Sequence, residues 1–222
     1  NLSAENLLSV MKEGIESNIY SRGSGVNFTR NVGLSSLSGV DPNEAFDVTP
    51  YAIATDKHFM SKITTYHLQK KLKVSYSSSY SDHAHCTIQD LGFIATMQNG
   101  EEYFRVFVGG GLGRNPKLSL ELNELIKPHE VLYYVEGLTN MFMKYCDYKN
   151  KHKARVKYIV ENLGEDEFLS KFKEFVKKEK YKGCLDLYPQ PITYNKLGVK
   201  IDLVDNRLIP QKQDGLYSVY IH

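Results

Sequence analysis

The chain has 222 residues, enough to bury a substantial core, and its 41% hydrophobic and 24% charged residues are ordinary for a globular protein. Its 28 lysines and arginines against 26 aspartates and glutamates give a net charge of +2, so the whole chain is not a polyanion-binding protein and any basic site must be local. No apolar run is long enough to span a bilayer and no signal-peptide pattern is present, so we expect a cytoplasmic protein with no membrane partner.

The first part of the chain predicts two helices separated by a loop and an extended segment. Apolar residues at helical spacing predict the first helix within residues 2–19. A glycine-containing loop follows, and then an extended segment, residues 28–34, which carries Arg30. Asp41-Pro-Asn-Glu44 has the residues of a helix start, and Thr49-Pro50 repeats the pattern. We therefore expect one helical turn near residue 41 and a longer helix after residue 50.

Alternating apolar and polar residues over 72–76 predict a β-strand. Side chains two residues apart point to the same face of a strand, so we expect Lys71 and Lys73 to point the same way. Alternate lysines are also common on exposed sheet edges, and taken alone this pair would be interpreted as solvent-exposed. The alternation matters because it brings two positive charges to one place.

A β-hairpin is predicted next. Two strands, over 91–97 and 103–108, are joined by Asn99-Gly100, and both residues tolerate the positive φ that a type I′ turn requires. The second strand runs directly into Gly-Gly-Gly-Leu-Gly at residues 109–113. This run lacks the spacing of a dinucleotide-binding fingerprint, and no acidic residue follows in a strand about twenty positions on. We therefore expect a glycine turn.

Four helices are predicted in the second half of the chain. Leucine spacing, aromatic spacing and turn residues place them at residues 118–126, 132–145, 156–163 and 168–180. The third helix follows a basic loop that contains Lys151 and Arg155. Lysines at a helix N-terminus are disfavoured by the helix dipole, so a bound anion would relieve a poor arrangement there. Alternating strands after Pro189 indicate the start of a further domain.

The sequence predicts no metal site within these residues. Cys86, Cys146 and Cys184 lie far apart without Cys-x-x-Cys spacing, which argues against a disulfide framework and against a self-contained zinc or iron–sulfur site. We expect ordinary thiols in a reducing compartment. His83 and His85 could share one strand face, but no third ligand lies nearby in the sequence.

Several of these segments together resemble the sirohaem-dependent nitrite and sulfite reductases in order and separation. The segments are Arg30-Asn-Val32, Gly39 to Tyr51, Leu68-Gln-Lys-Lys-Leu-Lys73, Gln89-Asp-Leu-Gly-Phe-Ile94, Val108-Gly-Gly-Gly-Leu-Gly113 and Asn150 to Tyr158. The resemblance implies an α+β fold in which helices cover a mixed β-sheet. It also implies three units: residues 1–20 as the end of a ferredoxin-like half-domain, 21–188 as the sirohaem-contacting domain, and 189–222 as the start of a second ferredoxin-like half-domain.

The resemblance also implies roles for individual residues. In that family sirohaem, bridged to a [4Fe–4S] cluster, passes six electrons to sulfite or nitrite. By motif, Arg30 would lie beside the substrate anion, while Lys71 and Lys73 would bind it and supply protons to its departing oxygens. The residues expected to bind the cofactor are Asn31, Gly109, Gly110, Gly111, Gly113, Lys151, Arg155, Gln211 and Gln213.

The chain also departs from the family pattern. The four cysteines that hold the family's cluster are absent, and so is an upstream arginine of the anion site, so we expect a fragment that is inactive alone. Its partners would be sulfite or nitrite, the rest of its own chain, and an electron donor, either ferredoxin or a flavoprotein. A non-catalytic oxyanion- or tetrapyrrole-binding module is the alternative. The near-neutral charge disfavours a nucleic-acid partner, and the glycine spacing disfavours a nucleotide.

Overall fold

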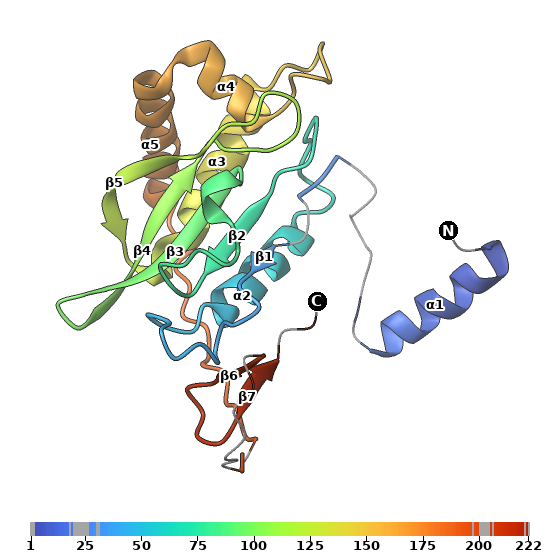
Figure 1. Cartoon of the computed structure of the whole chain (residues 1–222). Helices are drawn as coiled ribbons and strands as arrows, with labels where there is room; N and C mark the ends of the chain where they lie inside the picture. The colour runs from blue at the N-terminus through green and yellow to red at the C-terminus, as the bar shows by residue number, and fades with distance from the viewer. Residues whose placement is uncertain are drawn as a thin grey trace.

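The computed structural model describes residues 3–17, 19, 27–29, 32–196, 198–199, 205, 207–219 and 221. Figure 1 shows the course of the chain. The helices are α1 (Ala4–Glu16), α2 (Thr49–Ser61), α3 (Val131–Tyr145), α4 (Val156–Leu163) and α5 (Glu165–Lys182), with short 3-10 helices η1 (Cys86–Ile88) and η2 (Pro128–Glu130). The strands are β1 (Gly33–Leu34), β2 (Val74–Ser77), β3 (Leu91–Gln98), β4 (Glu101–Val108), β5 (Leu120–Ile126), β6 (Leu208–Pro210) and β7 (Tyr217–Val219).

The first five strands form one mixed sheet in the order β1-β2-β3-β4-β5. The pairs β1-β2 and β2-β3 are parallel, whereas β3-β4 and β4-β5 are antiparallel. Helices pack against this sheet, and the resulting core joins residues of the central strands to residues of α2, α3, α4 and α5 (Figure 1). The expected α+β fold with a mixed sheet covered by helices is confirmed.

The predicted hairpin is confirmed. Strands β3 and β4 pair along their whole length, from Leu91 opposite Val108 to Gln98 opposite Glu101. The two turn residues between them have positive φ, 54° at Asn99 and 78° at Gly100. These are the signs of φ that a type I′ turn requires at both central positions, so the turn chemistry fixes the register of the hairpin.

The predicted alternation around β2 is also confirmed. Tyr76 is fully buried in the main core, stacks on Phe93 with ring centroids 4.9 Å apart, and shares a 2.7 Å hydrogen bond with Thr55 of α2. Ser75 points to the opposite face, where its hydroxyl lies 3.4 Å from the Cys86 sulfur. Alternate residues therefore face a helix-covered core and a smaller cluster around η1.

The helix predicted over 118–126 is wrong. The segment forms β5, which pairs antiparallel with β4 and leaves Leu122 and Ile126 buried. The leucines at 118, 120 and 122 alternate with polar residues, which is the period of a strand. A bidentate pair between Arg105 of β4 and Glu121, at 2.7 and 2.9 Å, adds a cross-strand contact that the sequence did not reveal.

The other predicted helices form. Gly164 has φ of 83° and separates α4 from α5, as its position after α4 predicts. Residues 41–44 make a single turn, because the Asp41 carboxylate accepts from the Asn43 N–H and the Glu44 carboxylate accepts from the Gly39 N–H. The longer helix then begins at Thr49-Pro50. No helix among the described ranges is long and apolar enough to cross a membrane.

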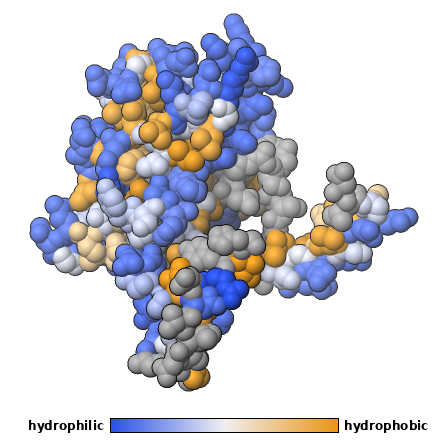
Figure 2. Space-filling view, viewed as in Figure 1, coloured by the Kyte–Doolittle hydropathy of each residue, from blue (hydrophilic) through white to orange (hydrophobic). Residues whose placement is uncertain are grey.

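The two ends of the chain contribute little to the core. Helix α1 has no buried residue, and Leu7, Leu8 and Met11 are among its exposed apolar side chains. Figure 2 shows hydrophobic surface, in orange, on this part of the chain. Strands β6 and β7 form a separate two-stranded sheet. Of the alternating pattern predicted after Pro189, residues 197–204 fall mostly outside the described residues. The proposed unit boundaries after residues 20 and 188 stay predictions.

Candidate functional site: a basic cleft

A cleft of about 400 Å³ lies where the loop before β2, the loop after β4 and the start of α4 meet. It is lined by Asn27, Lys70, Lys71, Leu112, Gly113, Arg114, Lys151, His152, Arg155, Lys157 and Tyr158. Six of these eleven described lining residues are lysine or arginine, and none of the eleven is acidic. The near-neutral chain thus concentrates positive charge in one place, which suits an anionic ligand.

The structure brings several predicted site residues into this cleft and places others beside it. Lys71, Gly113, Lys151 and Arg155 line it. Lys73 lies two residues further along the strand segment, and its backbone N–H donates to Asp90 Oδ2 at 2.9 Å. Segments that are eighty residues apart in the sequence therefore meet at one cationic surface.

The glycine run supplies close packing next to the cleft. The N–H groups of Gly109, Gly110 and Gly111 donate to the carbonyls of Asp90, Gln89 and Lys117, each at 3.0 Å. A Cβ on Gly110 would lie 2.3 Å from the Ser119 hydroxyl and 2.9 Å from two backbone atoms, so glycine is required there for space.

Arg155 is held by a buried carboxylate that the sequence did not single out. Its Nη2 donates to both oxygens of Asp90, at 3.1 and 3.0 Å, and Asp90 is fully buried. Burial raises the pKa of Asp90, and the Arg155 guanidinium opposes that rise. Arg155 Nε is buried and has no acceptor among the described residues. A buried donor without a partner is costly, so this atom is a candidate ligand contact.

Lys157 was also missed, because it lies within a helix that the sequence predicts as scaffold. Its ammonium donates to the carbonyls of Leu112, Arg114 and Asn115, at 3.2, 2.7 and 2.9 Å. Burial, reinforced by the charge of Arg155, lowers the pKa of Lys157. With three carbonyl acceptors, this lysine fixes the loop that forms one wall of the cleft.

Arg30 and Asn31 lie outside the described residues, so their predicted roles stay predictions. The residues just before them approach the cleft from the expected side. Thr29 forms a parallel bridge with Leu72, the residue between the two lysines, and Asn27 lines the cleft. Thr29 therefore lies beside the lysine segment.

Gln211 and Gln213 lie between β6 and β7 and do not line the basic cleft. Figure 1 shows β6 and β7 at the opposite end of the molecule from α4. The Gln213 side chain donates to the carbonyl of Gly39 at 2.6 Å, and the backbone N–H of Lys212 donates to the carbonyl of Val40 at 2.9 Å. Gln211 donates to the Ser218 hydroxyl at 3.1 Å. The structure therefore does not bring these two glutamines together with the lysines.

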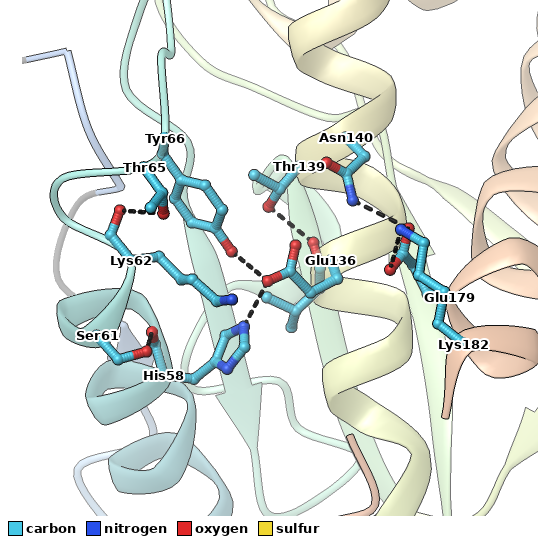
Figure 3. Close-up of polar contacts among 11 residues, drawn as sticks. His58, Ser61, Lys62, Thr65, Tyr66, Glu136, Thr139, Asn140, Glu179 and Lys182 are labelled. Carbon is cyan, nitrogen blue, oxygen red and sulfur yellow. Dashed lines mark hydrogen bonds and ion pairs between the residues drawn. The ribbon is translucent and has the colours of Figure 1, made fainter. Parts of the chain in front are cut away.

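A second polar cluster lies between α2, α3 and α5 (Figure 3). Glu136 is 6% exposed and accepts hydrogen bonds from His58 at 2.7 Å and from Tyr66 at 2.6 Å. Burial raises the pKa of Glu136, but these hydrogen bonds outweigh it and the net pKa is lowered. Glu179, also 6% exposed, accepts from Asn140 at 3.1 Å. This cluster ties three helices together, and its carboxylates have donors within the fold.

Within the described part of the chain, no three or more His, Cys, Asp or Glu side chains are grouped so that they could hold a metal ion. The described lining residues of the cleft include six lysines and arginines and no carboxylate, and such a lining suits oxyanions or carboxylates. Fold and cleft together define an α+β domain with a cation-lined cleft at the end of its central sheet.

Comparison with known proteins agrees with this class. The family model described as the nitrite and sulphite reductase 4Fe-4S domain matches residues 25–180. The chain belongs to this family. The match includes the lysine segment, the glycine run and the basic loop before α4, which are the segments that form the cleft.

Individual relatives point the same way. The chain is 26% identical over 206 residues to a chloroplastic ferredoxin–nitrite reductase of Zea mays, covering 90% of this chain and 35% of the relative. It is 31% identical over 115 residues to the sulfite reductase [NADPH] hemoprotein beta-component of Acidithiobacillus ferrooxidans, covering 49% of this chain and 20% of the relative. The chain therefore spans about a third of the length of the maize relative.

The fold also matches a solved structure. The Mycobacterium tuberculosis NirA protein superposes with a TM-score of 0.68 at 23% identity, covering 96% of this chain and 37% of that one. At this identity the match supports the fold alone.

Proposed function

We propose that this chain is the part of a sirohaem and [4Fe–4S] nitrite or sulfite reductase that supplies the cationic wall of the substrate and cofactor pocket. The observation that carries the proposal is the cleft itself, with six cations and no carboxylate among its described lining residues. An oxyanion that is reduced needs charge neutralisation and a supply of protons, and such a wall provides the first and can provide the second.

The residues present fit a cofactor that carries many carboxylates. Lys151 and Arg155 line the cleft, and the buried Nε of Arg155 is a donor without an acceptor among the described residues. A cofactor carboxylate would satisfy that donor and offset the charge around it. Sirohaem with its cluster would pass the six electrons from the electron donor to the substrate, and the protein would supply binding, orientation and protons.

Lys71 and Lys73 are proposed to bind the oxyanion and to donate protons to its departing oxygens, with Arg30 completing the site. Lys71 lies in the cleft lining, and Thr29 and Leu72 hold the segment before Arg30 next to the lysine pair. An ammonium group can both attract an oxyanion and transfer a proton to it within one contact.

We propose that the chain is inactive without the rest of the protein. Cys86 and Cys146 are buried free thiols and Cys184 is exposed, and their sequence spacing does not suit a four-cysteine cluster. The cluster ligands would come from elsewhere in the longer protein, and electrons would come from ferredoxin or a flavoprotein. A cytoplasmic location would keep these thiols reduced.

The test uses the full-length protein, produced in a host that makes sirohaem, and a variant with Lys71→Ala and Lys73→Ala. Both proteins should show a haem-like Soret band, but the variant should lose most oxidation of a reduced dye by nitrite or sulfite. Lys177→Ala with Lys178→Ala is the matched control, because it removes the same charge from α5, away from the cleft.

Either of two results would contradict the proposal. A full-length protein that folds but contains no sirohaem would leave a non-catalytic oxyanion-binding module as the better account. A variant without Lys71 and Lys73 that turns over as fast as the control pair would remove the proposed role of those lysines.

A further inference from the structure

Asp90 occupies the point where three segments of the basic cleft meet. Its carboxylate accepts the Lys73 backbone N–H at 2.9 Å and both bonds from Arg155 Nη2 at 3.0 and 3.1 Å. Its own carbonyl accepts from the N–H of Gly109 at 3.0 Å. The lysine segment, the glycine run and the start of α4 are thus joined through one residue that is fully buried.

The hydrogen bonds to Asp90 use only part of the Arg155 guanidinium. Both of its bonds to Asp90 use the same nitrogen, Nη2, while the buried Nε has no acceptor among the described residues. The side chain keeps 18% exposure and lines the cleft. Because the guanidinium is planar, bonds to Nη2 also fix the direction of its other N–H groups. A residue that does not touch a ligand can orient a binding group in this way.

We propose that Asp90 is a positioning residue of this site, one that sets the Arg155 guanidinium and the Lys73 segment relative to each other. The inference rests on the proposed function, since it assigns the contacts of the same cleft. Asp90 is too deeply buried to be a ligand itself, so it acts through the two residues that it holds, Lys73 toward the substrate anion and Arg155 toward the carboxylates of the cofactor.

Charge alone and position predict opposite effects of removing the Asp90 carboxylate on anion affinity. The buried Asp90 carboxylate offsets part of the positive charge of the cleft, so Asp90→Asn raises the net positive charge of the site by one. If charge alone decided affinity, anions would bind more tightly to the variant. If position decides it, affinity falls, because the amide nitrogen of asparagine cannot accept the bond that a carboxylate oxygen accepted.

The experiment compares full-length wild-type protein and Asp90→Asn, both loaded with sirohaem. The expected result is a rise of about tenfold in KM for nitrite or sulfite together with a fall in kcat, because the displaced Lys73 is proposed both to bind the anion and to donate protons to it. Faster hydrogen exchange at the Lys73 amide, whose acceptor is altered, is the expected structural readout. Sirohaem content per protein, from the Soret band, is measured in parallel.

Asp82→Asn is the matched control. Asp82 also accepts backbone N–H bonds, from Cys86 at 2.7 Å and Thr87 at 3.1 Å, but unlike Asp90 it is bonded to residues that do not line the cleft. It should lower stability and leave KM unchanged. If Asp90→Asn does not fold, Asp90→Glu keeps the charge, moves the carboxylate by one methylene, and should give the same rise in KM.

The outcomes separate the two proposals. Wild-type protein without sirohaem would refute the proposed function. Active, haem-loaded wild type together with an Asp90 variant whose KM is unchanged or lower would refute the positioning role alone. A KM rise that Asp82→Asn reproduces would also refute it, because the effect would then follow general loss of stability.

Discussion

Gly137 lies in the middle of α3 at the point where that helix packs most closely on α5. A Cβ added there would lie 2.9 Å from a Val176 methyl, 3.0 Å from its backbone nitrogen and 3.1 Å from its Cα. Two of these three atoms belong to the backbone of α5, so a change of rotamer cannot relieve the contact. Gly137→Ala therefore forces the two helices apart by a few tenths of an ångström.

Two effects of Gly137→Ala oppose each other. Alanine is favoured over glycine in a helix interior by about 1 kcal/mol. Overpacking a dense core costs about 1–3 kcal/mol, and here the upper part of that range applies because α5 must shift together with the buried Phe168 and Phe172. The net expectation is a loss of about 1–2 kcal/mol in the free energy of unfolding.

Urea unfolding followed by circular dichroism measures this loss as a lower midpoint with an unchanged m value. Gly14→Ala is the matched control, since Gly14 lies in α1, a helix with no buried residue. That variant should leave the main transition in place. A Gly137→Ala protein that is as stable as wild type, or more stable, would refute the packing argument.

Three further predictions follow from buried groups. Lys157→Met should lower the free energy of unfolding by about 1–3 kcal/mol. The low end of this range applies because water can reach the carbonyls of the exposed loop once the ammonium is removed. Hydrogen exchange over residues 112–115 should become faster. The pKa of Glu136 is lowered from 4.5 in the folded state, so the ionised side chain stabilises the fold above pH 4.5. That stabilisation is lost as the pH falls through the lowered pKa. Glu136→Gln should therefore show a shallower fall of the urea midpoint on acidification, and an equally steep fall would contradict this. Burial raises the pKa of Cys86 to about 12 and of Cys146 to about 11, so a thiol reagent should label Cys184 first in the folded protein.

The sequence alone determined the features that depend on local chemistry. Asn99-Gly100 specified a hairpin because few residues accept positive φ at two successive positions. The alternation over 72–76 predicted which side chains face the core, because the period of a strand is two. The family resemblance depended on short segments in order, and the family match covers residues 25–180.

Only the tertiary structure decided how these segments combine. Asp90 and Arg155 are 65 positions apart, and nothing local marks an aspartate as the partner of a distant arginine. Lys157 belongs to a helix, yet it binds carbonyls 42 to 45 residues earlier. Strand β5 was predicted as a helix because the apolar residues Leu118, Leu122, Leu125 and Ile126 also suit helical spacing, and pairing with β4 settled the choice. Hydrogen bonds and strand pairing between distant segments form only when the chain is packed, so local patterns cannot reveal them.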